Sequence, residues 1–264
     1  MTKKVTPKKA LGQHFLTDLG IARRIADTLA PFKGLPAVEV GPGMGVLTQF
    51  LLADGIDLKV VELDSESVEW LNSHYPALEG RIIEGDFLRL DLASLFPGAS
   101  KISVIGNYPY NISSQIFFHV LDYRDLVECC SGMLQREVAE RLAAKPGTKA
   151  RGILSVLLQA WYDVEYLFTV DETVFNPPPK VKSGVIRMTR RPGVDSLGCD
   201  EQLFKSVVKT SFGQRRKTLR NSLKPLAGPA GLPPAAESML GLRPEQLSVD
   251  QFIELTNIIA DSRR

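Results

Sequence analysis

Cysteine is scarce in this sequence, and long apolar runs are missing. Three cysteines among 264 residues, two of them adjacent at Cys129 and Cys130, make neither a disulfide framework nor a zinc site. No apolar run approaches the ~20 residues of a membrane-spanning helix. The N-terminal MTKKVTPKKALGQHFL lacks the apolar region of a secretory signal. The three histidines, His14, His74 and His119, are scattered along the chain. We therefore expect a cytoplasmic protein without a membrane partner or a bound metal.

Charge of one sign does not dominate the chain, whose formal net charge is +2, but charge is unevenly distributed. The first nine residues hold four lysines and no acid, residues 10–200 carry a net charge of −6, and residues 201–264 carry +4. The stretch SFGQRRKTLRNSLK has no acid and five cations: Arg215, Arg216, Lys217, Arg220 and Lys224. Such a density suits a phosphate-binding surface. An isolated basic run is, however, more often a solvent-exposed helix face.

Short apolar runs alternate with segments of helical spacing along most of the chain. With 44% hydrophobic and 23% charged residues, the composition is that of an ordinary globular protein. We expect strands at PAVEVG, LKVVELD, RIIEGD, KISVIGN, LVECCSGMLQ, DVEYLFTV and GVIRMTR. We expect helices at VLTQFLLADG, SESVEWLNSHYP with Ser65 as N-cap, SSQIFFHVLDY, REVAERLAAKPG and GILSVLLQAWY. This alternation predicts an α/β fold with a doubly wound sheet.

The pattern changes after RRPGVDSLG, where helical segments with Pro and Gly punctuation follow. We place a boundary near residue 192. The sequence thus predicts two domains, 1–192 and 193–264, of which the second is smaller and all-helical.

A glycine-rich loop follows the first expected strand. In VEVGPGMGVLT, Gly41, Gly43 and Gly45 stand between a strand and a helix, where glycine allows a tight turn and close approach of a ligand. Val46 stands where the dinucleotide pattern G-x-G-x-x-G has its third glycine. That pattern serves a pyrophosphate, so the departure favours a nucleoside ligand without phosphate.

Acids end the next two expected strands. Glu62 lies about 20 residues after the glycine loop, where a carboxylate can accept hydrogen bonds from ribose hydroxyls. Asp86, in EGDF, could accept from an adenine amino group. Glycine loop and acids together indicate a nucleoside site, with solvated loop acids as the alternative.

The stretch GNYPYNISS interrupts the chain after the strand KISVI. Pro109 lacks a backbone N–H and restricts the residue before it, so the strand must stop there. A simple turn would account for Asn and Pro. The Asn-x-Pro-aromatic order nevertheless resembles the motif of amino-directed adenine N6-methyltransferases, which use S-adenosylmethionine.

Four further stretches narrow this resemblance: KKALGQHFL, VEVGPGMGVLT, FNPPPKVKSGVI and SFGQRRKTLRN. Together, and in this order, they resemble the rRNA adenine dimethyltransferase family that acts on the small ribosomal subunit. The resemblance runs from about Lys8 to the end of the chain. It implies a Rossmann-like S-adenosylmethionine-dependent methyltransferase sheet in the first domain.

The resemblance also implies roles for individual residues. His14 and Leu16, in GQHFL, fall where the family closes one side of the cofactor site, although the family often has Asn in place of His14. For the cofactor, it implies Gly41 and Gly43 in the loop, Glu62 on the ribose and Asp86 on the adenine. For catalysis, it implies Asn107, Pro109, Tyr110 and Phe175, with Asn107 also facing the cofactor. Tyr108 departs from the usual Leu or Ile, which predicts altered packing beside the target pocket.

The chemistry explains why these residue types suit an adenine amino group. Its nitrogen lone pair is delocalised into the ring and must be localised before it can accept a methyl group. The Asn107 side-chain oxygen and the Pro109 carbonyl can accept the two amino hydrogens and stabilise the positive charge that grows on nitrogen. Tyr110 and Phe175 offer ring faces to a base taken out of its stack.

Three functions remain open from the sequence. The first is dimethylation of two adjacent adenosines in the 3′-terminal hairpin of 16S rRNA in a 30S precursor, by a monomer that contacts rRNA through Arg215, Arg216, Lys217 and Arg220. The second is methylation of large-subunit rRNA. The third is a non-enzymatic assembly factor on the same scaffold, which the intact Asn107, Pro109 and Tyr110 disfavour.

Overall fold

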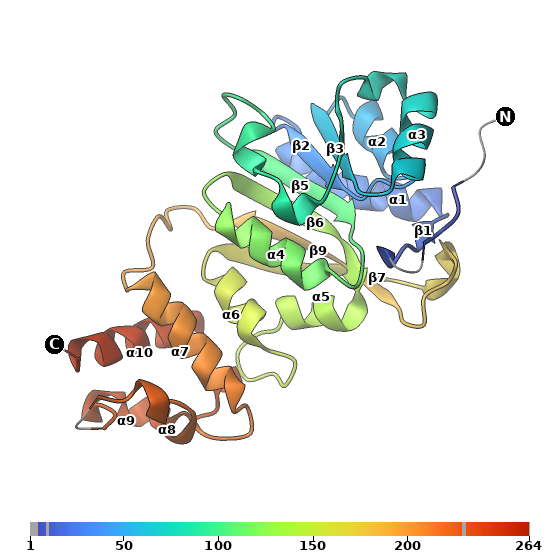
Figure 1. Ribbon diagram of the computed structural model, residues 1–264. Coiled ribbons are helices and arrows are strands. Elements are labelled where there is room, and N and C mark those ends of the chain that lie inside the picture. Colours follow the sequence, from blue (N-terminus) through green and yellow to red (C-terminus); the bar gives the residue numbers. More distant parts are fainter. Residues whose placement is uncertain (1–4, 9–10, 229–230, 264) are drawn as a thin grey trace. The chain divides into compact units, whose positions relative to one another are not determined.

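The described residues of this chain form two compact units (Figure 1). The computed structural model describes residues 5–8, 11–228 and 231–263. Unit 1 takes in the described residues up to Ala139 together with Val164–Arg190, and unit 2 takes in Glu140–Asp163 together with the described residues from Arg191 onward. The sequence pattern kept Glu140–Asp163 in the N-terminal domain. These residues instead belong to unit 2, because their helix packs against the C-terminal helices.

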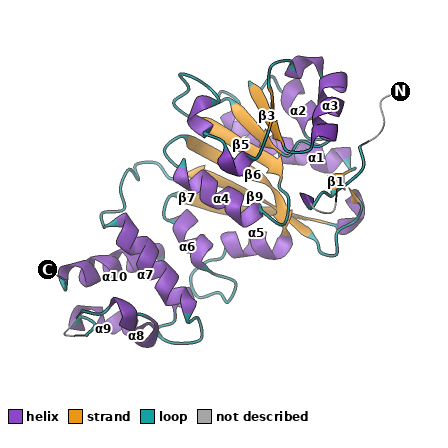
Figure 2. Cartoon of the chain, viewed as in Figure 1, coloured by secondary structure: helices purple, strands orange, loops and turns teal. Residues whose placement is uncertain are grey.

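A seven-stranded sheet forms the centre of unit 1 (Figure 2). Its strand order is β4 (Ile82–Glu84), β3 (Leu58–Glu62), β2 (Ala37–Val40), β5 (Ile102–Asn107), β6 (Val127–Gln135), β9 (Ser183–Arg190) and β7 (Tyr162–Val170). The first five strands are parallel, and β9 runs antiparallel to β6. The expected doubly wound sheet is confirmed.

The crossovers of this sheet change direction between β2 and β5. From β2 the chain passes through α2 (Thr48–Ala53) to β3 and through α3 (Ser65–His74) to β4, and from β5 it passes through α4 (Ser113–Asp122) to β6 on the other side. Right-handed crossovers in opposite directions put their helices on opposite faces. Figure 1 shows α4 in front of the sheet. The loops after β2 and β5 therefore part at the topological switch point, where doubly wound sheets bind ligands.

A second, two-stranded sheet was not indicated by the sequence. β1 (Phe15–Leu16) pairs antiparallel with β8 (Phe175–Asn176), so that Leu16 lies opposite Phe175. Each strand has only two residues, which is too short for an alternation of apolar and polar residues to be recognised in the sequence. The pairing joins the N-terminal segment to the NPPP loop across about 160 positions of sequence.

Two helices of unit 1, α1 (Leu19–Ala26) and α3, begin at aspartate caps. Asp64, not the expected Ser65, is the N-cap of α3, because its carboxylate accepts from Glu66 N–H. Asp18 caps α1, a helix that the sequence pattern did not indicate. α5 (Arg136–Leu142) follows β6 directly.

Unit 2 is built from helices: α6 (Ile153–Gln159), α7 (Glu201–Gly213), α8 (Leu219–Ser222), α9 (Glu237–Leu240) and α10 (Val249–Asp261). α7 packs on α10, where the rings of Phe212 and Phe252 lie 6.2 Å apart. Arg151, which has no exposed surface, donates to the Ala144 carbonyl and to Gln159 Oε1. These bonds close the turn between α5 and α6.

The side chain of Tyr108 is buried in the core behind the switch point, and the residue also belongs to one wall of the pocket at the ends of the strands. The side chain is 1% exposed, and its hydroxyl donates to the Ser131 carbonyl at 2.7 Å. Two glycines on neighbouring strands make the room: a Cβ on Gly106 would lie 3.1 Å from the tyrosine ring, and one on Gly132 would lie 2.7 Å from it. The departure from Leu or Ile is thus accommodated inside the sheet.

Replacing Gly132 with alanine should destabilise unit 1 strongly. The new Cβ would lie 2.2 Å from the Gly106 carbonyl oxygen, and the residue has φ of +154°. Because the clash is with a backbone atom, a side-chain movement cannot relieve it. We therefore expect the free energy of unfolding to fall by at least about 3 kcal/mol. Urea unfolding measures this. Gly34→Ala is the control, since Gly34 has open space around its Cβ position. Equal stability of the two variants would contradict the account.

Candidate active site

A pocket opens at the carboxyl ends of β2, β3 and β5 in unit 1. The pocket is partly open to solvent, and its wall is formed by loop backbone, two carboxylates and aromatic side chains. Four of its five wall segments follow strands: residues 40–43, 61–63, 85–87 and 107–112; the fifth is 11–15. The structure therefore brings together eight of the predicted site residues: His14, Gly41, Gly43, Glu62, Asp86, Asn107, Pro109 and Tyr110.

The glycine loop meets Glu62 inside this pocket. Gly43 N–H donates to Glu62 Oε2 at 3.0 Å, and Asp64 N–H donates to Glu62 Oε1 at 2.9 Å. Glu62 is 5% exposed, and burial raises its pKa, opposed by these two N–H groups. A Cβ on Gly43 would lie 2.9 Å from the Phe15 ring, so the loop backbone and the N-terminal segment touch only because this residue is glycine.

Asp86 stands at a second wall of the pocket. Its Oδ1 accepts from Leu88 N–H at 2.9 Å, which caps the short helix Phe87–Arg89. The carboxylate is about one-third exposed, and Oδ2 lies 3.7 Å from Arg89 Nε. A capped and partly exposed carboxylate keeps lone pairs available for a ligand amino group.

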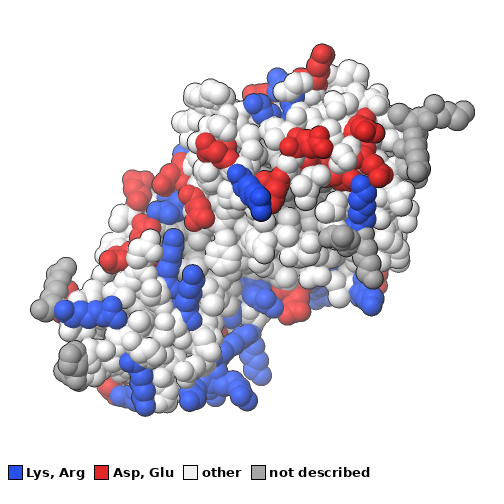
Figure 3. Space-filling model, viewed as in Figure 1, with Lys and Arg blue, Asp and Glu red and all other residues white. Residues whose placement is uncertain are grey.

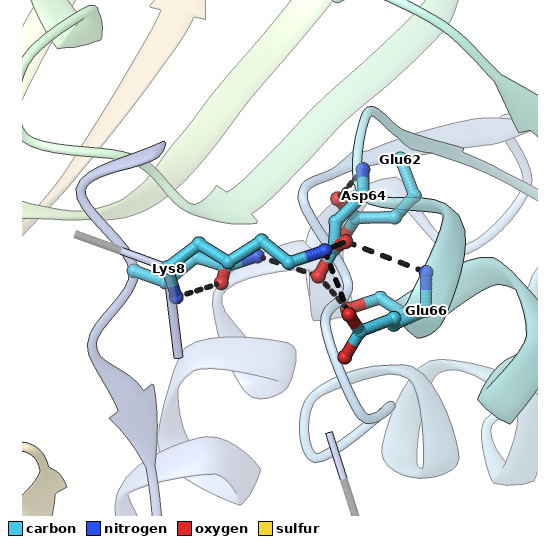
Figure 4. Close-up of polar contacts among 6 residues, drawn as sticks. Lys8, Glu62, Asp64 and Glu66 are labelled. Carbon is cyan, nitrogen blue, oxygen red and sulfur yellow. Dashed lines mark hydrogen bonds and ion pairs between the residues drawn. The ribbon is translucent and has the colours of Figure 1, made fainter. Parts of the chain in front are cut away.

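Asp64 joins the N-terminal segment to the acid end of β3 (Figure 4). Its carboxylate accepts from Lys8 Nζ and, at 3.2 Å, from Gln13 Nε2; Lys8 Nζ also lies 3.2 Å from Glu66. Burial opposes ionisation of Asp64, but the hydrogen bonds, led by that from Lys8, outweigh it and lower its pKa. This ion pair holds the wall residues 11–15 close to Glu62.

The side-chain amide of Asn107 is held through its nitrogen, while its oxygen has no donor among the described residues. Nδ2 donates to the His14 carbonyl at 3.2 Å, and no described group donates to Oδ1. The His14 ring stacks against Tyr110 at 5.5 Å, and its Nδ1 lies 2.8 Å from the Pro177 carbonyl. The Tyr110 hydroxyl lies 2.5 Å from Ser183 Oγ. The asparagine oxygen is therefore the atom left to accept a hydrogen bond from a substrate.

Two predicted site residues do not line the pocket. Leu16 and Phe175 are each 4% exposed and belong to the hydrophobic core, where they face each other across β1 and β8. In this structure their contribution is to position the neighbouring residues His14 and Phe15. Stacking of Phe175 on a target base stays a prediction.

The sequence missed several wall residues of the pocket. Leu63 follows Glu62 directly and is 55% exposed, although it is a large apolar side chain. Its place after a strand-ending acid is the signal that could have identified it. Further examples are Leu11, Gln13, Phe15, Phe87 and Asn111. Their positions depend on the β1–β8 pairing and on loop geometry, which no periodic pattern encodes.

Most cations of the basic stretch of unit 2 do not lie on a helix face, the alternative that the sequence left open. α7 ends at Gly213 and α8 begins at Leu219, so Arg215, Arg216 and Lys217 lie on the intervening turn. Arg216 and Lys217 are exposed, and no side-chain partner is recorded for either among the described residues. In Figure 3, Lys and Arg gather over the part of unit 2 where Figure 1 draws α7, α8 and α9.

Two of the other three cations of this stretch are engaged, and the third, Lys224, is exposed beyond α8. Arg220 forms an ion pair with Glu237, and Arg215 donates to the Lys149 carbonyl. Free positive charge on the turn therefore belongs chiefly to Arg216 and Lys217.

Within residues 5–8, 11–228 and 231–263, no cluster of three or more His, Cys, Asp or Glu is arranged to hold a metal ion. None of the helices in this described part has the length and apolar character needed to cross a membrane.

The chain matches the profile of the family described as ribosomal RNA adenine dimethylase over residues 5–261. A protein of Parabacteroides distasonis named ribosomal RNA small subunit methyltransferase A is 70% identical over 96% of this chain and 94% of its own length. A protein of the same name from Bacteroides thetaiotaomicron is 61% identical over 98% of this chain and 96% of its own length.

Solved structures share the fold. A dimethyladenosine transferase from Plasmodium falciparum superposes with a TM-score of 0.75 at 23% identity, covering 95% of this chain and 98% of its own. The 23S rRNA methyltransferase ErmE superposes with a TM-score of 0.71 at 25% identity, and the match covers 93% of this chain and 99% of the ErmE chain.

The switch-point pocket and these likenesses define the class: this is a Rossmann-like methyltransferase that uses S-adenosylmethionine as methyl donor. Within that class, the chain belongs to the ribosomal RNA adenine dimethylase family.

A buried acid adjoins the glycine loop. Glu39, on β2, is 1% exposed, and its Oε2 accepts from the Thr48 hydroxyl at 2.7 Å. Burial, opposed by the Thr48 bond and assisted by the charge of Glu62, raises the pKa of Glu39 to about 8. Glu39 is therefore mostly neutral at pH 7.

Stability should fall as pH rises toward the pKa of Glu39. The unfolded chain loses this proton near pH 4.5 and the folded chain near pH 8, so the folded state loses relative stability across that window. The slope from one group is at most about 1.4 kcal/mol per pH unit. Glu39→Gln keeps an oxygen for Thr48 but does not titrate, so its stability relative to wild type should rise with pH in urea unfolding.

Glu79→Gln is the control for this titration, because Glu79 is exposed. It should follow the wild-type pH dependence. A Glu39→Gln curve parallel to wild type would show that Glu39 does not titrate in this window.

Proposed function

We propose that this chain dimethylates the N6 amino groups of two adjacent adenosines in the 3′-terminal hairpin of 16S rRNA, within a precursor of the 30S subunit. We propose further that it acts in the cytoplasm as a monomer. The observation that carries the chemistry is the anchored amide of Asn107, whose Nδ2 is used by His14 and whose oxygen is left for a substrate. The names of the relatives at 61–70% identity support the small subunit as target.

The walls of the pocket fit S-adenosylmethionine. Gly43 offers close backbone approach, Glu62 offers carboxylate oxygens for ribose hydroxyls, and Asp86 offers an acceptor for the adenine amino group. Leu63 offers an exposed apolar surface beside them. When bound, the cofactor supplies a methyl group on a positively charged sulfur.

Asn107 and Pro109 prepare the adenine nitrogen. Their carbonyl oxygens accept the two N6 hydrogens, which localises the lone pair and stabilises the charge that develops on nitrogen. N6 forms a bond to the methyl carbon as the carbon–sulfur bond breaks, the sulfur becomes a neutral thioether, and N6 then loses a proton to solvent. A neutral amide suits this position because it adds no full charge near the sulfonium. A second round on the same nitrogen gives the dimethylated base.

The aromatic rings hold the flipped base. Tyr110 is fixed by Ser183 and by the His14 ring, so it can present a ring face without losing side-chain entropy. We infer that Phe175 supports this surface, either directly or by packing behind the NPPP loop.

Incubation with methyl-labelled S-adenosylmethionine tests the function. Unmethylated 30S subunits should gain two methyl groups on each of two adjacent adenosines, identified by mass spectrometry of the rRNA. Purified 50S subunits and naked 16S rRNA are the controls and should gain far less label. Because ErmE, a 23S enzyme, shares the fold, the 50S arm is decisive: labelling of 50S alone would assign the large subunit as target. Transfer to no substrate would indicate an assembly factor.

Asn107→Ala should lower the methylation rate about a hundredfold or more while sparing most cofactor affinity. One aimed hydrogen-bond acceptor is lost from the transition state, and such losses cost about 10²–10³ in kcat. Single-turnover methylation of 30S subunits and calorimetry with S-adenosylhomocysteine measure the two quantities. Asn72→Ala, on an exposed face of α3, is the matched control. Methylation at the wild-type rate would remove Asn107 from the mechanism.

The Arg216→Ala/Lys217→Ala double variant should weaken binding to 30S subunits. Each lost phosphate contact reduces the salt slope of binding by about one unit, so the double variant should lose about two. Filter binding across a salt titration measures this, and cofactor affinity should stay unchanged. The control is Arg81→Ala/Lys101→Ala, which removes two cations already paired with Asp57 and Glu128. Equal slopes for the two double variants would rule out the turn as an rRNA contact.

A further inference from the structure

Two aromatic donors, one on α3 and one at its C-cap, hydrogen-bond the backbone of the glycine loop from outside the ligand pocket. Trp70 Nε1 donates to the Met44 carbonyl at 3.2 Å. The Tyr75 hydroxyl lies 2.9 Å from the Gly45 carbonyl and 3.3 Å from that of Met44. Neither Trp70 nor Tyr75 lines the pocket. Both act on the backbone of the loop and not on a ligand.

The third glycine of the loop, Gly45, leaves the space that the Tyr75 ring occupies. Gly45 has φ of +82°, and a Cβ there would lie 2.4 Å from Cε2 and Cζ of the Tyr75 ring. Two of the glycines in the G-x-G-x-G loop thus have a packing cause, because Gly43 leaves room for the Phe15 ring and Gly45 leaves room for the Tyr75 ring. The backbone of the loop is therefore packed directly against two aromatic side chains.

This clamp sets the direction of the loop peptides. The carbonyls of Met44 and Gly45 point to the aromatic donors, while the N–H of Gly43 points to Glu62 at the pocket wall. Without the outer donors, the loop could rotate these peptides at little cost, because glycine permits many backbone conformations. Trp70 is itself fixed, since its ring stacks on His74 at 3.7 Å.

We propose that Tyr75 and Trp70 are positioning residues of the cofactor site, which preorganise the glycine loop for S-adenosylmethionine. Preorganisation raises affinity because less conformational freedom is lost on binding. A clamp on the cofactor loop acts equally on bound cofactor and on the transition state. Its loss should therefore raise KM for the cofactor with little change in kcat.

Tyr75→Phe isolates the hydroxyl, because the ring that fills the space beside Gly45 is retained. We expect the Kd for S-adenosylhomocysteine, measured by calorimetry, to rise about fivefold to tenfold, the range for one lost hydrogen bond to a buried acceptor. KM for S-adenosylmethionine should rise by a similar factor, and kcat on 30S subunits should stay near the wild-type value. Trp70→Phe should act in the same direction, because it keeps a ring on His74 but lacks the N–H.

Tyr123→Phe is the matched control. Its hydroxyl lies 3.1 Å from Asp91 in an exposed place away from the loop, so its loss should leave Kd unchanged. Calorimetry requires no rRNA, so the result stands whichever ribosomal subunit is the target. Unchanged Kd in both Tyr75→Phe and Trp70→Phe would overturn the proposal. A fall in kcat with unchanged KM would overturn it as well, because a loop clamp acts on cofactor binding.

Discussion

Close approach of backbone at the carboxyl ends of β2 and β5 is the constraint on which the pocket depends. Where the crossovers diverge, the chain must turn sharply, pass between aromatic rings and still present N–H groups to a ligand. Gly43 and Gly45 meet this requirement against Phe15 and Tyr75. Glycine also allows close packing inside the sheet, where glycines on β5 and β6 leave room for the Tyr108 ring. Glycine here is a packing residue as much as a flexible one.

Carboxylates crowd the region around this backbone, and their environments give them different tasks. Glu39 has a single hydroxyl donor and a raised pKa, so it is held neutral and serves the fold. Glu62 receives two backbone N–H groups that also orient it toward the pocket. Asp64 is paired with Lys8 and draws the N-terminal wall into place. The three acids are compatible within 26 positions, because Glu39 keeps its proton at neutral pH and adds no further negative charge beside Glu62.

The sequence was sufficient for the sheet and for most of the site, because both follow from local patterns. Strand-loop-helix order located the glycine loop, Glu62 and the Asn107 motif, and parallel strands then bring their ends together. The N-terminal wall could not be found from local patterns, since it depends on a pairing between β1 and β8 that has two residues on each side. The basic turn has residues that favour a helix, since Arg and Lys are good helix formers, but α7 ends at Gly213. The sequence does not place Glu140–Asp163 in unit 2, because α6 is mostly apolar and its pattern does not show which helices it packs against.

The most direct test of the account is a crystal structure of this chain with S-adenosylhomocysteine, the product that the transfer leaves behind. The account predicts the ribose hydroxyls on Glu62, the adenine amino group on Asp86, and the thioether sulfur facing Asn107. It also predicts that the Tyr75 hydroxyl still donates to the Gly45 carbonyl. A ligand bound without contact to Glu62, or a glycine loop turned away from Tyr75 in the complex, would contradict it.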